Sequence, residues 1–350
     1  MKRMSVFLPL LLATVIGCSE STPKSGSAGG LGAAGGGGKS FELLNVSYDP
    51  TRELWKELNS AFIESYQAET GNTVTIKQSH GSSGGQARAV IDGLEADIVS
   101  LALWSDTDQL RKKNLIKDGW EGRLPNRSLP YTSTIVFVVR KGNPKQIKDW
   151  PDLVKAGVEI ITPSPKTSGN GKLAFLGGWG SVVLKGGTEE QAREYVTKLY
   201  KQVPNLETGA RGATTTFAQK GIGDVHLTWE NEAHLEVKEA KANGEELEII
   251  YPSLSILAEP HVAVVDTFVD KKQTREVAEA YLKYLYTDKG QEIIAKHYYR
   301  PSSADLLAKH ADVFPAMKLF QITEIAKGWD DAQERFFAEG ALFDSIYQSK

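Results

Sequence analysis

The chain has 350 residues, of which 41% are hydrophobic and 24% are charged, and its formal net charge is −3. This length predicts about two domains with a sizeable core, and the composition is typical of a globular protein. No block of basic residues stands out, so the charge pattern argues against a nucleic-acid partner.

The first 40 residues predict export. Lys2 and Arg3 precede the apolar run "VFLPLLLATVIG", which is too short to span a bilayer comfortably and indicates a signal peptide over residues 1–17. The sequence "VIGC" resembles a bacterial lipobox, which implies cleavage before Cys18 and lipidation of its thiol; a signal peptide with a chance cysteine is the alternative. Cys18 is the only cysteine, so no intrachain disulfide can form. Residues 18–40 are rich in Gly and Ser and predict a flexible tether.

From Phe41 onward, strand patterns alternate with helix patterns. The strand-like segments "FELLNVSYD" and "NTVTIKQSHG" flank a helical pattern in "PTRELWKELNSAFIESYQAETG", and a further helix is expected in "QARAVIDGLEA". The segment "DIVSLAL" lacks polar alternation, as expected for a strand buried on both faces. This order predicts an α/β fold with a mainly parallel sheet.

A second α/β unit is predicted from "STIVFVVRKGNP" onward, and "ILAEPHVAVVD" is expected to be another long strand, followed by two helices. The chain therefore predicts two lobes joined by crossing strands, with a ligand cleft between them. We assign residues 41–123 and 257–310 to lobe I and residues 124–256 to lobe II. Residues 311–350 are expected to form a C-terminal helical segment that packs on the lobes.

Three loops share one design, in which small residues lead directly into a helix. They are "HGSSGGQ" (80–86), "KTSGNG" (166–171) and "TGARGATT" (208–215). The open N–H groups at a helix start bind anions together with the helix dipole, and small side chains let the anion reach the backbone. The three loops together therefore predict an anion site. The Gly-x-x-x-x-Gly-Lys-Ser/Thr pattern of phosphate-loop NTPases is absent.

Several other patterns have two interpretations. Trp229 ends an apolar strand, where its indole N–H could donate to an anion or the ring could simply pack in the core. Glu230 and His234 could share a helix face as metal ligands, although a solvated polar face is the simpler interpretation. Tyr298 and Tyr299 form a pair of the sort that binds ferric iron in some exported receptors, or they pack at a helix end. The sequence shows no nucleophile beside a base, so we expect no enzyme.

The motifs "LLNVSYDPTREL", "QSHGSSG", "YTSTIVFVVRKGNPKQIKDW", "TGARG" and "GIGDVHLTWENEA" resemble the bacterial periplasmic sulfate-binding proteins of ABC importers. The likeness covers nearly everything from Phe41 to Lys350. It implies a two-lobed type II periplasmic-binding fold, in which each lobe is a mainly parallel sheet flanked by helices and the ligand sits in the interlobe cleft. It also implies a monomer without a cofactor, located in the periplasm or on the outer cell surface, that delivers sulfate or thiosulfate to the membrane subunits of an ABC permease. A receptor for another tetrahedral oxyanion, such as molybdate or phosphate, is the alternative.

The resemblance further implies which residues hold the anion. Ser168 would donate through both its N–H and its hydroxyl, Trp229 through its indole, and the other donors through backbone N–H groups. The implied binding residues are Ser83, Ser168, Gly169, Asn170, Ala210 and Trp229, with Asp49 and Arg211 as supports nearby. Sulfate carries no proton at neutral pH, so a pocket made only of donors suits it, whereas protonated phosphate would bring a hydrogen with no acceptor to meet.

One stretch departs from the family pattern, which runs Asn-Pro-Lys-Ser/Thr-Ser-Gly-Gly-Ala-Arg. This chain has Ser164 at the first position and Asn170, Gly171 and Lys172 at the last three. A lysine cannot reproduce the forked contacts of an arginine, and an asparagine adds a side chain beside the anion. The expected effect falls on affinity and on the preference between sulfate and thiosulfate.

Overall fold

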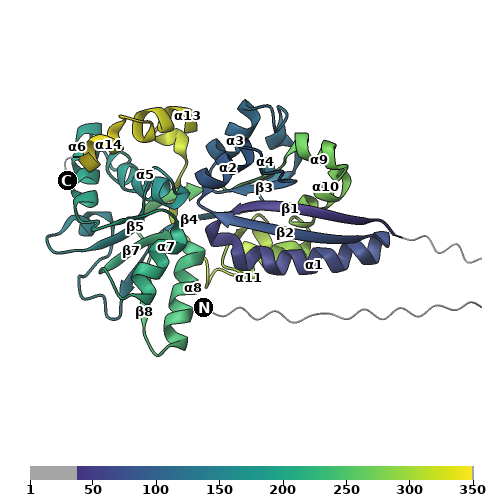
Figure 1. Cartoon of the computed structure of the whole chain (residues 1–350). Coiled ribbons are helices and arrows are strands. Elements are labelled where there is room, and N and C mark those ends of the chain that lie inside the picture. Colours follow the sequence, from purple (N-terminus) through teal and green to yellow (C-terminus); the bar gives the residue numbers. More distant parts are fainter. Residues whose placement is uncertain (1–37, 349–350) are drawn as a thin grey trace, which may run out of the picture. The chain divides into compact units, whose positions relative to one another are not determined.

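The computed structural model of the protein describes residues 38–348 (Figure 1). The predicted signal peptide, Cys18 and the tether up to residue 37 lie outside the described residues. Residues 38–348 contain two β-sheets, each with its own helices. The predicted lobe boundaries follow these two sheets only approximately, and they stay a prediction.

The first sheet has four strands in the order β10-β3-β1-β2. Its strands are β1 (Ser40–Tyr48), β2 (Thr73–Gly81), β3 (Ile98–Leu101) and β10 (His261–Val264). The first three run parallel, and β10 pairs antiparallel with β3 at the edge. The prediction of a mainly parallel sheet is therefore confirmed here. In Figure 1, β1 and β2 lie side by side.

Helices between and after these strands belong to the same part of the chain. They are α1 (Arg52–Thr70), α2 (Ser83–Ile91), α3 (Trp104–Lys112), α9 (Asp266–Lys272), α10 (Arg275–Tyr284) and α11 (Asp288–Lys296). The helix α1 ends at Gly71, whose φ of 71° is the left-handed conformation that glycine adopts without strain. Short turns η1 (Asp49–Thr51), η2 (Trp120–Arg123) and α4 (Pro125–Ser128) complete this part.

The second sheet has eight strands, with the path β12-β9-β4-β7-β5-β6 and with β8 and β11 also paired to β4. They are β4 (Tyr131–Arg140), β5 (Ile160–Pro163), β6 (Leu206–Glu207), β7 (Val225–Trp229), β8 (Leu247–Ile250), β9 (Leu254–Ala258), β11 (Arg300–Pro301) and β12 (Lys318–Phe320). The expectation of a mainly parallel sheet is wrong for this half, because β4 runs antiparallel to β7, β8, β9 and β11. The chain reaches β4 from the first sheet and not from a neighbouring strand of the second. No helical crossover, the connection that makes neighbouring strands parallel, therefore precedes β4 within the second sheet.

The remaining helices accompany the second sheet or the C-terminal segment. They are η3 (Trp150–Val154), α5 (Gly169–Val183), α6 (Glu189–Lys201), α7 (Ala210–Thr214), η4 (Thr215–Gln219), α8 (Glu230–Ala242), α12 (Ala304–Lys309), η5 (Ile322–Glu324), α13 (Trp329–Ala332), η6 (Gln333–Phe337) and α14 (Leu342–Gln348).

The segment "ILAEPHVAVVD" was expected to be one strand, and this prediction is wrong. The structure divides it into β9 and β10, which belong to different sheets, with Glu259 and Pro260 between them. Proline has no N–H to donate to a ladder, so Pro260 ends the pairing of one sheet before the next begins. The chain thus passes from the second sheet back to the first at this point.

The helix α5 is buried on all sides, and every residue from Gly169 to Ser181 is buried. Its glycines let aromatic rings approach: a Cβ added at Gly180 would lie 2.2 Å from Cζ of Phe320. Phe175 packs against the C-terminal segment, with ring centroids 5.6 Å from Phe336 and 5.3 Å from Phe337. The C-terminal segment therefore covers the helix whose first residues line the candidate site.

Candidate functional site

A small cavity lies where loops of the two sheets meet. It is lined by Tyr48, Asp49, Pro50, Gly81, Ser82, Ser83, Ala102, Ser168, Gly169, Asn170, Ala210 and Trp229. Its volume of about 10 Å³ is far below the range of about 300–1,000 Å³ that is usual for small-molecule pockets. The cavity therefore suits a ligand of the size of a small ion. All predicted binding residues and Asp49 line it, whereas Arg211 does not.

Ser83 is the first residue of α2 and is almost fully buried. Its hydroxyl donates to Oδ2 of Asp106 at 2.5 Å and accepts from the N–H of Ala102 at 2.9 Å. The N–H of Ser83 has no hydrogen bond within residues 38–348, as is usual for the first N–H of a helix. Ser83 can therefore offer an anion its N–H but not its hydroxyl, whose proton is already given to Asp106.

Ser168 is the N-cap of α5 and uses its two donors differently from the prediction. Its N–H donates to the carbonyl of Ser164 at 2.9 Å, so the interpretation that this N–H binds the anion is wrong. Its hydroxyl has no partner within the described part of the chain. The next N–H groups, of Gly169 and Asn170, begin the helix and are open for the same reason as that of Ser83. A Cβ at Gly169 would lie 2.5 Å from that of Ala102, so only glycine fits there.

Asn170 brings a polar side chain to the cavity wall. Its Nδ2 donates to the carbonyl of Leu227 at 3.0 Å, while its Oδ1 is buried and has no partner among residues 38–348. A buried acceptor without a donor is costly. The departure from the family pattern therefore adds a second side chain with a carbonyl or carboxylate oxygen, after Asp49, to the residues that line the cavity, and its Oδ1 has no donor within residues 38–348.

The third loop and Trp229 complete the wall. Ala210 begins α7 after Gly209, and a Cβ at Gly209 would lie 2.9 Å from Oδ2 of Asp49. Trp229 is fully buried, and its ring centroid lies 5.3 Å from that of Tyr48. Its indole N–H has no partner within residues 38–348, so it remains available to a ligand in the cavity.

Cationic side chains near the cavity are already paired. Arg211 lies behind the wall, where its Nη2 is 3.1 Å from Oε2 of Glu53 and 3.3 Å from Oε1 of Glu232. Lys172 donates to Oε1 of Gln333 at 2.9 Å and lies 4.0 Å from Oδ1 of Asp106. The lining contains no lysine or arginine, so an anion there would be held by N–H and hydroxyl dipoles.

His80 and Glu232, two titratable residues near the cavity, have shifted pKa values. Burial, assisted by the charge of Arg52, lowers the pKa of His80 to about 4. Burial raises the pKa of Glu232 to about 8, against the opposing charge of Arg211. At neutral pH both side chains are therefore mainly uncharged, and neither His80 nor Glu232 changes its charge strongly between pH 5 and 7.

Asp106 is a site residue that the sequence analysis missed. It lies in the first turn of α3, a helix that was not predicted, and it holds the hydroxyl of Ser83. The acidic residues of "SDTDQL" are a usual signal for a helix start. That signal could have predicted α3, but not the contact with a serine 23 residues earlier.

The alternative sites are not assembled. Tyr299 is buried and donates to the carbonyl of Pro50 at 2.8 Å, whereas Tyr298 stacks on His234 with centroids 4.7 Å apart. Glu230 accepts two hydrogen bonds from Arg300, at 2.7 and 2.8 Å. Residues 38–348 contain no group of three or more His, Cys, Asp or Glu side chains that could hold a metal ion.

A family model described as "Bacterial extracellular solute-binding protein" matches residues 52–300. The chain belongs to this family. It is 53% identical over 309 residues to the sulfate-binding protein of Salmonella typhimurium, a match that covers 88% of this chain and 93% of the relative. It is 50% identical over 321 residues to the thiosulfate-binding protein of Pseudomonas aeruginosa, with 91% and 96% covered.

Solved structures of other solute-binding proteins agree with the fold. The sulfate-binding protein SubI from Mycobacterium tuberculosis matches with a TM-score of 0.76 and 31% identity, over 85% of this chain and 99% of that one. A periplasmic thiamin binding protein matches with a TM-score of 0.57 at 17% identity, over 73% and 81%, which shows the fold alone. This solute-binding protein has the predicted type II periplasmic-binding fold. Among the described helices, none is both long enough and apolar enough to cross a bilayer.

Proposed function

We propose that this solute-binding protein is an extracytoplasmic receptor for sulfate or thiosulfate that delivers the anion to the membrane subunits of an ABC importer. The observation that carries the proposal is the ion-sized cavity onto which open donors converge. These donors are the N–H groups at the starts of α2, α5 and α7, the hydroxyl of Ser168 and the indole of Trp229. The relatives named for sulfate and thiosulfate binding support the same ligand class.

The physical basis is the match between donors and a fully ionised tetrahedral anion. Helix starts provide N–H groups and the positive end of the helix dipole, so the anion needs no cationic side chain in contact. Sulfate has only acceptors, and each of its oxygens can meet a donor. A receptor for phosphate or molybdate is the alternative, but the relatives above favour neither anion.

The proposal includes attachment to the membrane through a lipid on Cys18, with the receptor acting as a monomer in the periplasm or on the outer surface. It rests on "VIGC" at the end of an apolar signal core and on the small-residue tether that follows. Two or more acyl chains anchor a protein stably, since each buried CH₂ contributes about 0.8 kcal/mol. We also propose that the chain divides into lobe I (41–123 and 257–310), lobe II (124–256) and a C-terminal segment that packs on the lobes.

Calorimetry with sulfate, thiosulfate, phosphate and molybdate tests the ligand class. We expect sulfate or thiosulfate to bind at least about a hundredfold more tightly than phosphate near neutral pH, a difference of about 2.7 kcal/mol. Phosphate that displaces sulfate at equal concentration would contradict the proposal. Hydrolysis assays on sulfate esters should show no turnover, because the proposed role is binding and not catalysis.

A further inference from the structure

Within residues 38–348 the chain passes between the two sheets three times: before β4, between β9 and β10, and before β11. We call residues 129–130, 259–260 and 297–299, which lie at these passages, the crossing segments. Tyr299 ends the third segment, and its ring centroid lies 4.6 Å from that of Tyr131, the first residue after the first segment. Tyr299 therefore lies where two of the crossing segments meet.

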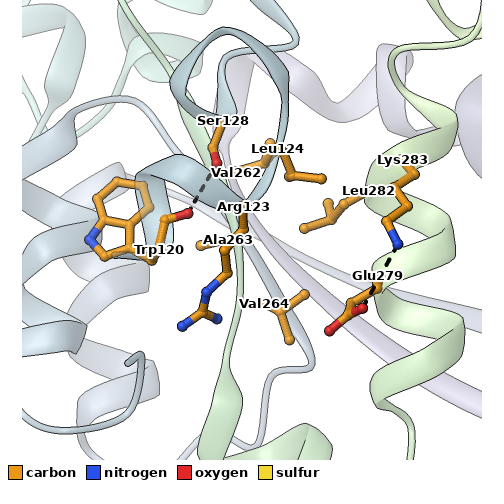
Figure 2. Close-up of a pocket in the computed structure, with 10 residues that line it drawn as sticks. All are labelled: Trp120, Arg123, Leu124, Ser128, Val262, Ala263, Val264, Glu279, Leu282 and Lys283. Atoms are coloured by element: carbon orange, nitrogen blue, oxygen red, sulfur yellow. Dashed lines mark hydrogen bonds and ion pairs between the residues drawn. The ribbon is translucent and has the colours of Figure 1, made fainter. Parts of the chain in front are cut away.

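The elements around the first sheet are braced beside these segments. Figure 2 shows the part of the chain from η2 to α4, which leads into the first segment, opposite α10 and across the strand β10. The hydroxyl of Ser128, the last residue before the first segment, donates to the carbonyls of Trp120 and Glu121 at 3.2 and 3.0 Å. The chain that leads into β4 is therefore held in a fixed turn.

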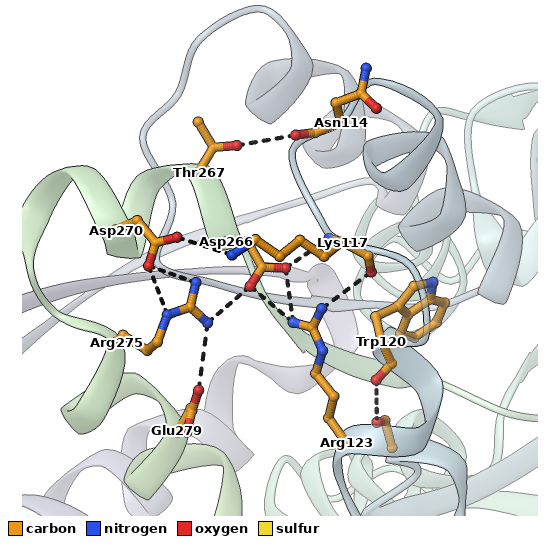
Figure 3. A network of polar contacts seen from close by, with 10 residues as sticks. Asn114, Lys117, Trp120, Arg123, Asp266, Thr267, Asp270, Arg275 and Glu279 are labelled. Atoms are coloured by element: carbon orange, nitrogen blue, oxygen red, sulfur yellow. Dashed lines mark hydrogen bonds and ion pairs between the residues drawn. The ribbon is translucent and has the colours of Figure 1, made fainter.

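A buried carboxylate joins the chain before the first crossing segment to the chain after the second (Figure 3). Asp266 follows β10 and accepts from Nη1 of Arg123 at 2.8 and 3.0 Å, and it lies 2.9 Å from Nη1 of Arg275 in α10. It also accepts from the N–H of Lys117 at 2.7 Å. A movement of one sheet relative to the other would therefore fall on the crossing segments and not within this braced part.

The hydroxyl of Tyr299 contacts the wall of the anion cavity from behind. It donates to the carbonyl of Pro50 at 2.8 Å. Pro50 lies in η1 beside Asp49, and both of these residues line the anion cavity, whereas Tyr299 does not. Tyr299 therefore joins a crossing segment to the part of the wall that follows β1.

Asn231 extends this contact to the wall on the side of the second sheet. Its Nδ2 donates to the hydroxyl of Tyr299 at 3.0 Å and lies 3.4 Å from the carbonyl of Pro50. Asn231 is the second residue of α8, two positions after Trp229, which lines the cavity at the end of β7. Asn231 and Tyr299 are both buried, where a lost hydrogen bond is costly. A hydrogen-bonded chain thus connects the start of α8 with η1.

An ion pair fixes the end of this chain that lies on the second sheet. Arg300 directly follows Tyr299, and its guanidinium donates to Glu230, the residue before Asn231, at 2.7 and 2.8 Å. Two consecutive residues at the crossing therefore bind two consecutive residues at the start of α8. Because this ion pair is buried, it keeps Tyr299 aligned with α8, and the bond to Pro50 transmits that position to the first sheet.

We propose that Tyr299 and Asn231 are positioning residues that set the spacing between the two walls of the anion cavity without touching the anion. The inference rests on the proposed receptor function and deepens it. N–H donors at helix starts hold an oxygen only at about 2.7–3.2 Å, so the two walls must come together at a defined spacing. The hydrogen-bonded chain fixes that spacing at the place where the two sheets are joined.

Tyr299→Phe tests the chain, since it removes the hydroxyl and keeps the ring against Tyr131. Sulfate binding should weaken about five- to tenfold, through faster dissociation with a nearly unchanged association rate. Calorimetry measures the affinity, and stopped-flow tryptophan fluorescence measures the two rates. Tyr281→Phe is the matched control, because Tyr281 is also fully buried and its hydroxyl donates to Asn59, while neither residue lines the anion cavity. Its melting temperature should fall by a similar amount while sulfate binding stays unchanged.

Asn231→Leu removes the donor at the other end of the chain with little change in side-chain volume. It should also weaken sulfate binding. The loss in the double variant with Tyr299→Phe should differ from the product of the two single losses by at least about twofold, because the two side chains act as one unit.

Two results would overturn the inference while the receptor proposal stands. They are equal sulfate affinities of the Tyr299→Phe and Tyr281→Phe variants, and losses that simply multiply in the double variant. Sulfate and thiosulfate binding by the unmodified protein is measured alongside. If neither anion binds the unmodified protein, the receptor proposal itself is wrong, and the inference is lost with it.

Discussion

The donor side chains of the anion cavity differ in whether their removal would leave other protein groups without a hydrogen-bond partner. The hydroxyl of Ser168 and the indole of Trp229 have no partner within the described residues, so they are free to serve the ligand. The hydroxyl of Ser83 joins Asp106 to the N–H of Ala102. Its removal would leave two buried polar groups unpaired. Ser168 and Trp229 therefore test ligand binding, and Ser83 tests the integrity of the wall.

Ser168→Ala should weaken sulfate binding by roughly ten- to a hundredfold, because a hydrogen bond to a charged group contributes about 1.5–3 kcal/mol. Trp229→Phe should have an effect of similar size while it keeps most of the ring packing. Ser181→Ala is the control, since within residues 38–348 that hydroxyl bonds only to the carbonyl of Gly178 in the same helix. Calorimetry on variants with unchanged melting curves measures the ranking. An unaltered affinity in Ser168→Ala would refute this assignment of donors.

Asn170→Gly should tighten sulfate binding by about three- to tenfold, because it removes an unsatisfied acceptor from the cavity wall. The same change loses the bond from Nδ2 to Leu227 and places a glycine in a helix, so the melting temperature should fall slightly. Calorimetry and thermal unfolding measure the two effects. Weaker sulfate binding in this variant would show that Oδ1 does not oppose the anion.

At the scale of elements, the sequence analysis predicted the helices and strands that are determined by a local pattern of residues. The strand β1, the helix α1 and the strand β2 follow from periodicity and from the glycine stop at Gly71. The split of β9 from β10 was missed, although Pro260 signalled it. The hydrogen bond from the N–H of Ser168 to the carbonyl of Ser164 could not be predicted. It requires one particular turn, and other conformations of the same loop would leave this N–H without that acceptor.

The close packing of the helix α5 can be tested by mutation. A Cβ at Gly180 would meet the ring of Phe320 at 2.2 Å, so Gly180→Ala should lower the free energy of unfolding by about 1–3 kcal/mol through overpacking. Gly122→Ala is the matched control, since no heavy atom lies within 4 Å of its added Cβ. Urea unfolding measures both variants. Equal stability of the two would mean that Phe320 moves aside freely.

At the scale of the whole molecule, the buried Glu232 links stability to pH. Because burial raises its pKa from 4.5 to about 8, the folded protein holds a proton that the unfolded chain releases above its lower pKa. The folded state therefore loses stability as pH rises from about 4.5 to 8.

Glu232→Gln should flatten this decline in the free energy of unfolding, measured by urea unfolding between about pH 5 and pH 8. Glu239→Gln changes an exposed glutamate on the same helix and should keep the slope. An identical slope in the Glu232 variant and in the unmodified protein would show that other groups control the decline.

Membrane attachment is also a property of the whole molecule. If Cys18 carries the lipid, the unmodified protein should fractionate with bacterial membranes and Cys18→Ala should not, since the chain has no other cysteine. Fractionation of the full-length gene product from a bacterium measures this. Soluble behaviour of both forms would disprove the anchor.

The bare backbone at Gly209 sets a clearance between the two sheets. A Cβ on this loop of the second sheet would lie 2.9 Å from Oδ2 of Asp49 in the first. An added side chain would either displace this carboxylate, which accepts from Arg52 at 2.7 Å, or hold the start of α7 away from those of α2 and α5. Since N–H···O hydrogen bonds are about 2.7–3.2 Å long, the second outcome would weaken the binding of a small ion without altering a single donor. The spacing of the donors thus depends on a side chain that the sequence leaves out.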